Sequence, residues 1–360
     1  MMDEITRRRF LLASAGAGVG LLMGQAAWLC AASAAPTDPT AGDDVFGCDP
    51  NPTGDPIGGG DGYRRILTGG DFTVKTPEEL IWSLKEARAG QVIYVPDGVA
   101  LDLTGSGTLT IPEGVTLAGS RGAQASPGAL LIRKDESGAL LAAGGDAIRV
   151  TGLRFEGAYA GPERVATNSR FLTIARYGCE VDNCEVFAFN LTGVSVMPEA
   201  MKTHIHHNFL HHIQLGGMGY AVLTEASDTR IIANRLDYGR HFIAGGAVGC
   251  GYEAAYNWVG PNTTSHQFDM HGGADRGDGT DIAGDWMHVH HNTFGGKERH
   301  VVIRGVPSHG AWIHNNWFAG PPVERIGIAY TPDVGRIHAY RNAYGPDKVV
   351  ENFTKLIPRG

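Results

Sequence analysis

One asparagine-containing pattern recurs through the second half of the chain. In each occurrence an apolar or small residue stands three positions before the asparagine and an apolar residue stands two positions after it. A period of about 20–50 residues is typical of a solenoid. Each period here contains strand-like runs and no helical pattern, so the repeat predicts a parallel β-helix whose asparagines bond their amides from coil to coil. The asparagines, spaced by 26, 23, 35, 24 and 26 residues, are Asn208, Asn234, Asn257, Asn292, Asn316 and Asn342.

The same alignment extends one coil earlier. There Asp182 is expected to take the position of the asparagine, with Cys179 and Cys184 as its flanking residues. Several histidines fall at the asparagine corner itself, where we expect them to stack structurally and not to form a catalytic site. They are His206, His207, His290, His291 and His314.

The two ends of the chain are predicted to lie outside the solenoid. Residues 1–34 carry three arginines, an apolar run and a small-residue cleavage pattern, which predict a twin-arginine-type signal peptide and export to the periplasm or beyond. The apolar run is shorter than the ~20 residues of a membrane span. Residues 35–70, rich in Pro, Gly and Asp, are predicted to be a flexible linker, and 346–360 a C-terminal tail.

Charge narrows the possible partners. The formal net charge is −8, and removing residues 1–34 changes it to −9, because three arginines and two acidic residues are lost. An acidic protein without a basic patch is not expected to bind nucleic acid. The four remaining cysteines contain no CxxC pair, which argues against a disulfide scaffold or a zinc ribbon. The expected partner is an acidic polysaccharide, bound by a monomer.

An amphipathic helix is predicted at the start of the solenoid, residues 71–345. Thr76 is a suitable N-cap, Pro77 stands at the first helical position, and Glu79 follows three residues after the cap. This helix is expected to cover the open N-terminal end of the coils, where bare strand edges would otherwise pair with other chains.

The helix, the segment 111–119 and the asparagine coils together resemble the right-handed parallel β-helix proteins of the pectate lyase superfamily. The resemblance implies a single-stranded right-handed parallel β-helix and a polysaccharide-active protein, with lyases, epimerases, glycoside hydrolases and non-enzymatic spikes as members. Within it, Asp269-Met270-His271 is similar to the Asp-Pro-His motif of alginate C5-epimerases, with Met270 in place of the proline.

Ionisable residues gather on adjacent coils around that motif. Alternation in 266–271 turns Phe268 and Met270 to one side and Gln267, Asp269 and His271 to the other. Asp269 lies twelve residues after Asn257 and Arg304 twelve after Asn292, which predicts that they lie side by side. The candidate catalytic residues are His241, Asp269, His271 and Arg304, and the candidate substrate-binding residues are Arg240, His266, Lys297 and His300.

This set suits proton abstraction next to a carboxylate, where a histidine is the base and an arginine or a cation neutralises the carboxylate. A polysaccharide lyase acting by β-elimination is the first hypothesis. A uronan C5-epimerase, a glycoside hydrolase and a non-catalytic glycan-binding protein remain as alternatives. The 35-residue period contains a long loop, 272–284, beside the site.

Two metal sites are compatible with the sequence. The loop carries Asp275, Asp278 and Asp281 on a glycine-rich turn, which could bind calcium. The imidazoles of His241, His266 and His271 could instead bind zinc or manganese.

Overall fold

The computed structural model describes residues 44–159, 161–296, 299–320, 326–327 and 335–353. The chain divides into two units, Met1–Val45 and Phe46–Gly360, and every helix and strand named below belongs to the second unit. The predicted signal peptide lies outside the described residues. Within the described ranges, no helix is long and apolar enough to cross a membrane.

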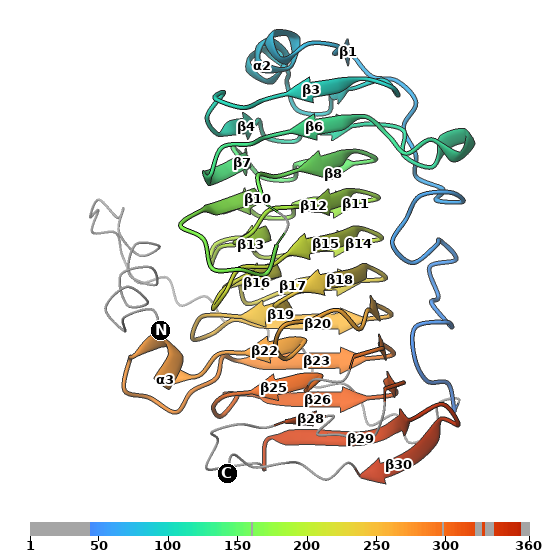
Figure 1. The fold of residues 1–360 in the computed structure, drawn as a ribbon, viewed down its shortest axis with the longest axis vertical. Helices are drawn as coiled ribbons and strands as arrows, with labels where there is room; N and C mark the ends of the chain where they lie inside the picture. Colours follow the sequence, from blue (N-terminus) through green and yellow to red (C-terminus); the bar gives the residue numbers. More distant parts are fainter. Residues whose placement is uncertain (1–43, 160, 297–298, 321–325, 328–334, 354–360) are drawn as a thin grey trace. The chain divides into compact units, whose positions relative to one another are not determined.

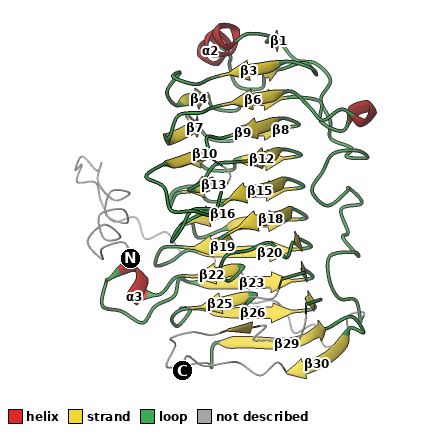
Figure 2. Ribbon diagram, viewed as in Figure 1, coloured by secondary structure: helices red, strands yellow, loops and turns green. Residues whose placement is uncertain are grey.

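Most coils contribute one short strand to each of three faces, and equivalent strands of successive coils pair in parallel (Figures 1 and 2). The first face contains β1 (Phe72–Thr73), β2 (Val92–Tyr94), β5 (Thr116–Ala118), β8 (Arg149–Thr151), β11 (Glu180–Asp182), β14 (Thr203–His206), β17 (Thr229–Ile232), β20 (Gly251–Ala255), β23 (Trp286–His290), β26 (Gly310–His314) and β29 (Ile337–Tyr344). The second face contains β3 (Ala100–Asp102), β6 (Leu130–Ile132), β9 (Arg154–Glu156), β12 (Glu185–Phe187), β15 (Phe209–Ile213), β18 (Arg235–Gly239), β21 (Trp258–Val259), β24 (Thr293–Phe294) and β27 (Trp317–Phe318).

The third face is a separate 9-stranded sheet, whereas β29 pairs with both β26 and β27 and so joins the first two faces into one sheet. Its strands are β4 (Leu109–Ile111), β7 (Ser137–Ala143), β10 (Asn168–Ile174), β13 (Thr192–Val196), β16 (Tyr220–Thr224), β19 (His241–Gly245), β22 (Phe268–Met270), β25 (Val301–Ile303) and β28 (Ile326–Gly327). This arrangement confirms the predicted parallel β-helix.

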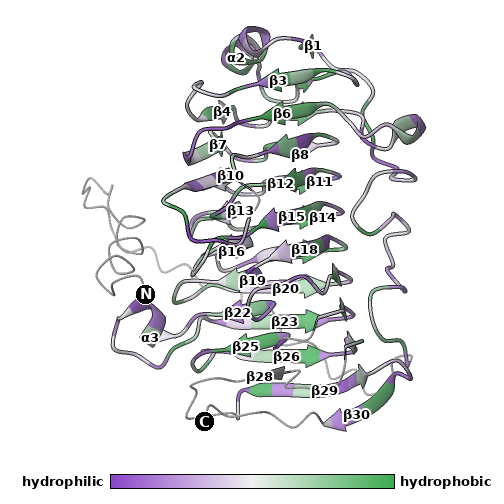
Figure 3. Cartoon of the chain, in the orientation of Figure 1, coloured by the Kyte–Doolittle hydropathy of each residue, from purple (hydrophilic) through white to green (hydrophobic). Residues whose placement is uncertain are grey.

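Apolar side chains from all three faces fill the interior of the coils. Many strands are coloured green, for hydrophobic residues, in Figure 3. Rings stack along the coil axis, as in the column formed by Phe294, Phe318 and Tyr344, whose centroids are 5.1 and 5.2 Å apart. Interior residues of one coil therefore pack against the same position in the next, which is why the hydrophobic pattern repeats with the coil.

The asparagine ladder is confirmed between the first and second faces. Nδ2 of Asn208 donates to Oδ1 of Asn234 at 3.1 Å, and Nδ2 of Asn234 donates to Oδ1 of Asn257 at 3.1 Å. The residue before each ladder position turns the chain with a positive φ, for example 53° at His207. The ladder amides also bond backbone carbonyls of the preceding coil, so this buried corner keeps its polar groups paired.

One ladder expectation is wrong. Asp182 pairs in register with His206, two positions before the asparagine, and the ladder position of that coil is occupied by Cys184. The backbone N–H of Cys184 donates to Oδ1 of Asn208 at 2.9 Å, as the asparagines do farther along. The residue with positive φ at this corner is Asn183, which places the corner one residue later than Asp182.

The predicted capping helix is present as α2 (Pro77–Glu86), at the N-terminal end of the coils (Figure 1). Its capping box is complete: the hydroxyl of Thr76 accepts from the N–H of Glu79, and the Glu79 carboxylate accepts from the N–H of Thr76. Leu80 and Leu84 are buried in the interior cluster, so α2 covers the end of the apolar stack. Two short helices complete the described elements, η1 (Ala123–Ala125) and α3 (Gly273–Arg276).

The predicted flexible linker is wrong for residues 46–66, which we call the strap. The strap has no regular secondary structure, but it runs along the stack beside the first face, opposite to the coil order (Figure 1). Backbone N–H groups of Gly47 and Gly58 donate to carbonyls of Asn315 and Ala233, and that of Gly60 donates to Oδ1 of Asn183. These hydrogen bonds, and not a periodic apolar face, hold the strap against the coils of the β-helix.

The predicted C-terminal tail also contains structure. Within residues 346–360, β30 (Val349–Phe353) pairs antiparallel with β29. It therefore covers part of the last coil.

Candidate functional site

The candidate site centres on Asp269, in the middle of β22 on the third face. Phe268 and Met270 point into the interior cluster, and Asp269 points the other way, as the alternation predicts. The Asp269 side chain is nevertheless fully buried, at 0% exposure, because neighbouring side chains cover it. The predicted open face is therefore a buried polar cluster at this position.

Arg304 holds this carboxylate through two contacts. Nε donates to Oδ1 of Asp269 at 3.1 Å, and Nη2 donates to Oδ2. Nη1 donates to Asp275 at 2.5 Å, so all three guanidinium nitrogens are engaged. Burial alone would raise the pKa of Asp269, but Arg304 and the neighbouring histidines hold it well below its usual value. Asp269 is therefore an anion throughout the neutral pH range.

Three imidazoles surround the same carboxylate. The Nε2 atoms of His266 and His271 each lie 3.0 Å from Oδ2 of Asp269, and that of His241 lies 3.8 Å away. These three Nε2 atoms are buried, and none of the contacts has the geometry of a hydrogen bond, so they have no hydrogen-bond partner in the described structure. Burial lowers the pKa of His241 well below its ordinary value and also lowers that of His271, so both rings are neutral at pH 7.

The tautomer of His241 follows from its other nitrogen. Nδ1 lies 2.6 Å from the backbone carbonyl of His266. A carbonyl only accepts, so Nδ1 carries the proton and Nε2 carries the lone pair. The His241 ring also stacks on that of His266, with centroids 4.0 Å apart.

Arg304 reaches Asp269 from a different register than predicted. β22 and β25 pair Asp269 with Val302 and Met270 with Ile303, so Arg304 follows one residue after the partner of Met270 and lies beside His271. The coil of Asn257 has two more residues between its corner and the third face than the coil of Asn292. The long arginine side chain spans this shift, and the predicted Asp269–Arg304 pair still forms.

His300 was predicted to face outward, and this is wrong. Its side chain is 1% exposed, its ring stacks on Phe318, and its Nδ1 lies 2.6 Å from Oε1 of Gln267. Gln267 is likewise buried and donates to the carbonyl of Gly260. Both residues precede a strand of the third face, at a corner where the alternation of a strand does not hold.

The remaining predicted binding residues have separate positions. Arg240 is partly buried at the corner before β19, and its carbonyl accepts from the hydroxyl of Thr263. Lys297 lies outside the described residues. His266 belongs to the central cluster around Asp269.

The acidic loop arranges its carboxylates in separate pairs. Asp275, in α3, accepts from Arg304 and from the N–H of Gly272. Asp278 accepts from Nε of Arg276 at 2.7 Å and from Thr280. With Asp281, these aspartates are absent from the clusters of metal-binding type in the described structure. The loop acts as a cover: Arg276 also donates to the carbonyls of His271 and Ile282.

Tyr220 belongs to the site, and the sequence interpretation missed it. It pairs in register with His241 one coil earlier on the third face. Its ring centroid lies 5.6 Å from that of His241 and 6.0 Å from that of His271. The asparagine alignment could have found it, because Tyr220 lies twelve residues after Asn208, the same offset that selected Asp269 and Arg304.

Three groups of donor atoms in the described structure have the spacing of a metal site, with all ligand atoms within 4.8 Å of one another. One lies in the central cluster and consists of His241, His266 and Asp269. The other two lie on the first face and consist of Glu180, His204 and His206, and of Glu253, His288 and His290.

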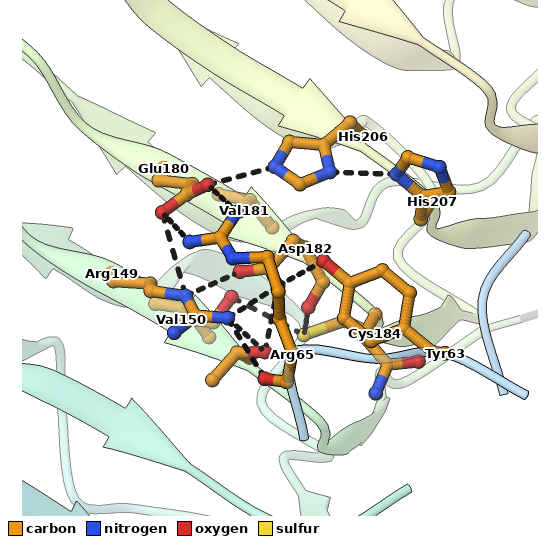
Figure 4. Close-up of polar contacts among 12 residues, drawn as sticks. Tyr63, Arg65, Arg149, Val150, Glu180, Val181, Asp182, Cys184, His206 and His207 are labelled. Atoms are coloured by element: carbon orange, nitrogen blue, oxygen red, sulfur yellow. Dashed lines mark hydrogen bonds and ion pairs between the residues drawn. The ribbon is translucent and has the colours of Figure 1, made fainter. Parts of the chain in front are cut away.

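The groups on the first face are ion-pair networks. Glu180 accepts from the strap residue Arg65 and from His206 and pairs with Arg149 (Figure 4). Glu253 is paired in the same way, with Nε of Arg230 at 2.8 Å and Nε2 of His290 at 3.2 Å. Each carboxylate oxygen of Glu180 and Glu253 therefore already has a partner. These contacts support the prediction that the corner histidines are structural.

Comparison with known proteins leaves the family open. No family model matches the chain, and no curated protein matches it. Among solved structures, the crystal structure of an alginate lyase from Paenibacillus sp. str. FPU-7 is 14% identical, with a TM-score of 0.41, over 76% of this chain and 97% of that chain. At this TM-score, nothing about the reaction of the present chain follows from the likeness.

Proposed function

We propose that the chain is an exported polysaccharide lyase, which cleaves a uronic-acid-containing polysaccharide by β-elimination. The observation that supports it best is the placement of His271 beside Arg304 at the ends of adjacent strands, where burial keeps the His271 ring neutral by lowering its pKa. A neutral imidazole is a suitable general base. Placement in the pectate lyase superfamily, export by residues 1–34 and a monomeric state belong to the same proposal.

The proposed reaction is a proton abstraction followed by elimination. The neutral His271 ring takes the proton from C5 of the uronate, and the released electron pair forms the C4–C5 double bond as the C4–O bond breaks. Tyr220, whose ring lies against His271, donates a proton to the departing oxygen. Positive charge beside the substrate carboxylate stabilises the intermediate anion, and Arg304 provides part of it.

Arg170 is the partly exposed end of a third-face column whose other members, among them Tyr220 and His241, are buried. Arg170, Thr192, Tyr220 and His241 share one column in register. Neighbouring strands lie about 4.8 Å apart, so Arg170 stands roughly 14 Å from the position of His241 along the coil axis. A cation at that distance suits the carboxylate of a second sugar along the chain.

Epimerisation at C5 is the second candidate, because the motif Asp269-Met270-His271 is similar to the epimerase motif. It begins with the same proton abstraction and differs only in the next step, in which C5 is reprotonated from the other side. The products differ: elimination shortens the polymer and creates an unsaturated end, and epimerisation does neither.

The test is incubation of the purified protein with polymannuronate, polyguluronate and polygalacturonate. Elimination is measured by ultraviolet absorbance of the unsaturated product, and epimerisation by proton NMR of the intact polymer. We expect absorbance to rise with at least one of these polymers. An unchanged spectrum together with an inverted C5 signal would replace the lyase by the epimerase, and no change in either would overturn the proposal.

A further inference from the structure

We propose that His241, His266 and Asp269 bind one divalent transition-metal ion of the zinc class. Their donor atoms, two imidazole Nε2 atoms and one carboxylate oxygen, lie within 4.8 Å of one another. They come from adjacent coils of the third face, on β19, β22 and the segment before β22. A rigid scaffold thus holds the three donors close together before any ion arrives.

The state of His241 is the independent observation that indicates a ligand. Its side chain is fully buried, at 0% exposure, and its Nε2 has no hydrogen-bond partner in the described structure. A buried polar atom without a partner is unfavourable for folding. The backbone carbonyl that accepts from Nδ1 orients the ring and leaves the lone pair on Nε2, as is usual for metal-bound histidines.

The chemistry of the donors selects the type of ion. Calcium prefers six to eight oxygen ligands, whereas imidazole nitrogens suit zinc and its neighbours in the first transition row. Three protein ligands leave a position open, as in catalytic zinc sites. His271 lies beside the same carboxylate, at 3.0 Å from Oδ2, but is not a member of the ligand group.

The charge balance gives the ion a role. Arg304 faces two carboxylates, Asp269 and Asp275, which leaves one negative charge uncompensated when the imidazoles are neutral. Such a cluster repels a uronate carboxylate. A divalent ion reverses the sign of this charge and supplies the positive centre that the elimination needs. Only this role rests on the proposed function; the binding of the ion does not.

The group on the first face provides a matched control. Glu253, His288 and His290 have the same donor spacing, but Nε2 of each histidine already has a hydrogen-bond partner, unlike those of His241 and His266 in the described structure. Arg230 and His290 occupy the two oxygens of Glu253, and Nε2 of His288 lies 2.8 Å from Nε2 of His314. We therefore expect no ion there.

The experiment is a titration of the full-length chain, purified without a polyhistidine tag and stripped with a chelator. Zn²⁺ and Ca²⁺ are titrated by calorimetry, and Co²⁺ is added to obtain the visible spectrum of the bound ion. We expect one Zn²⁺ per chain, no comparable Ca²⁺ binding, and a cobalt spectrum that Zn²⁺ abolishes. Loss of a residue that only orients a ligand lowers metal affinity about 10–100-fold, so H266Q, which removes a ligand, should lower it by more. H288Q should bind like the parent chain.

Circular dichroism of each variant checks the fold, and His266 is suited to substitution because its side chain is 17% exposed. The absence of stoichiometric Zn²⁺ binding to the folded parent chain would overturn the proposal, and so would equal binding by H266Q. These measurements contain no substrate. A chain that binds Zn²⁺ but forms no unsaturated product would therefore contradict the proposed lyase and leave the metal site standing.

Discussion

Two regions of the molecule surround a carboxylate with the same residue types but differ in their hydrogen bonding. On the first face, Glu253 is surrounded by histidines and an arginine, and on the third face Asp269 is surrounded in the same way. The first carboxylate has its partners in hydrogen-bond geometry. Around the second, three imidazole Nε2 atoms are buried without a hydrogen bond in the part of the chain that the structure describes, whereas the first face has one such atom, Nε2 of His204.

This difference in hydrogen bonding distinguishes the residues that stabilise the fold from those that we propose to act in function. Histidines of the first face lie beside the ladder corner and stack from coil to coil, as His290 does on His314 at 5.4 Å. They continue the regular repeat. The third-face cluster lies where the repeat is broken by the loop 272–284, and its polar groups are gathered without being satisfied. Unsatisfied buried groups are unfavourable for folding, so three of them gathered around one carboxylate indicate a function.

The largest expected effect contrasts one histidine from each region. H271Q should lower the rate of elimination about 10²–10⁴-fold, because it removes the general base. H291Q, at the ladder corner, should leave the rate per folded molecule unchanged and lower the melting temperature instead. Initial rates on the active polymer, divided by the folded fraction, make the comparison. Full activity in H271Q would show that the third-face cluster is not the catalytic site.

The next contrast concerns the arginines. R304Q leaves the buried Asp269 carboxylate without its partner, and breaking such a pair costs about 3–5 kcal/mol of unfolding free energy. R230Q removes the equivalent partner of Glu253, but the Arg230 side chain is 53% exposed, so we expect about 0–1 kcal/mol. Urea denaturation of both variants measures the difference. Equal losses would show that burial does not distinguish the two networks.

The pH dependence of stability separates the regions further. Burial lowers the pKa of His288 and of His291 to about 3, from 6.5. The unfolded chain therefore binds more protons below pH 6.5, and stability decreases as the pH falls from 6.5 towards 3. Each such histidine contributes a slope of up to about 1.4 kcal/mol per pH unit.

H288Q should flatten this decline, because glutamine does not titrate. Unfolding free energies at pH 7, 5.5 and 4.5 provide the measurement. Glu253 interferes little in this range: its carboxylate, with a pKa lowered to about 2 by Arg230 and His290 against the effect of burial, loses its contribution only below about pH 4.5. An unchanged slope in H288Q would contradict the burial of this ring as the cause.

Periodicity explains how much of the fold the sequence could predict. The asparagine ladder, the strand faces and α2 all depend on local patterns that repeat or on a complete capping box, and the structure confirms them. The error at Asp182 arose because polarity was used to choose the ladder position. The residue with positive φ, Asn183, sets the corner. The backbone N–H that bonds to the asparagine ladder is therefore that of Cys184.

The parts that failed lack such a pattern. The strap has no periodicity, and it is held by backbone hydrogen bonds to residues far away in the sequence, such as that of Gly47 with Asn315. At the site, spacing from the ladder found Asp269 and Arg304 but gave their register two residues out, since corner lengths differ between coils. His300 also lies at such a corner, and its side chain points inward for that reason.

The smallest expected effect concerns the strap over the first face. The hydroxyl of Tyr63 donates to Oδ2 of Asp182 at 2.7 Å, and burial raises the pKa of this phenol (Figure 4). Y63F removes that hydrogen bond, while Asp182 keeps its contacts with Arg149 and Thr151. Because the carboxylate remains paired, we expect a loss near the lower end for a charged acceptor, about 1.5 kcal/mol of unfolding free energy.

Y238F is the matched control, because Tyr238 is 41% exposed. It should change stability by less than about 0.5 kcal/mol. The lyase rate should be unaffected in both variants, since neither ring belongs to the third face. A loss of activity in Y63F at full folding would mean that the first face communicates with the site, and the separation of stability from function between the two regions would then be wrong.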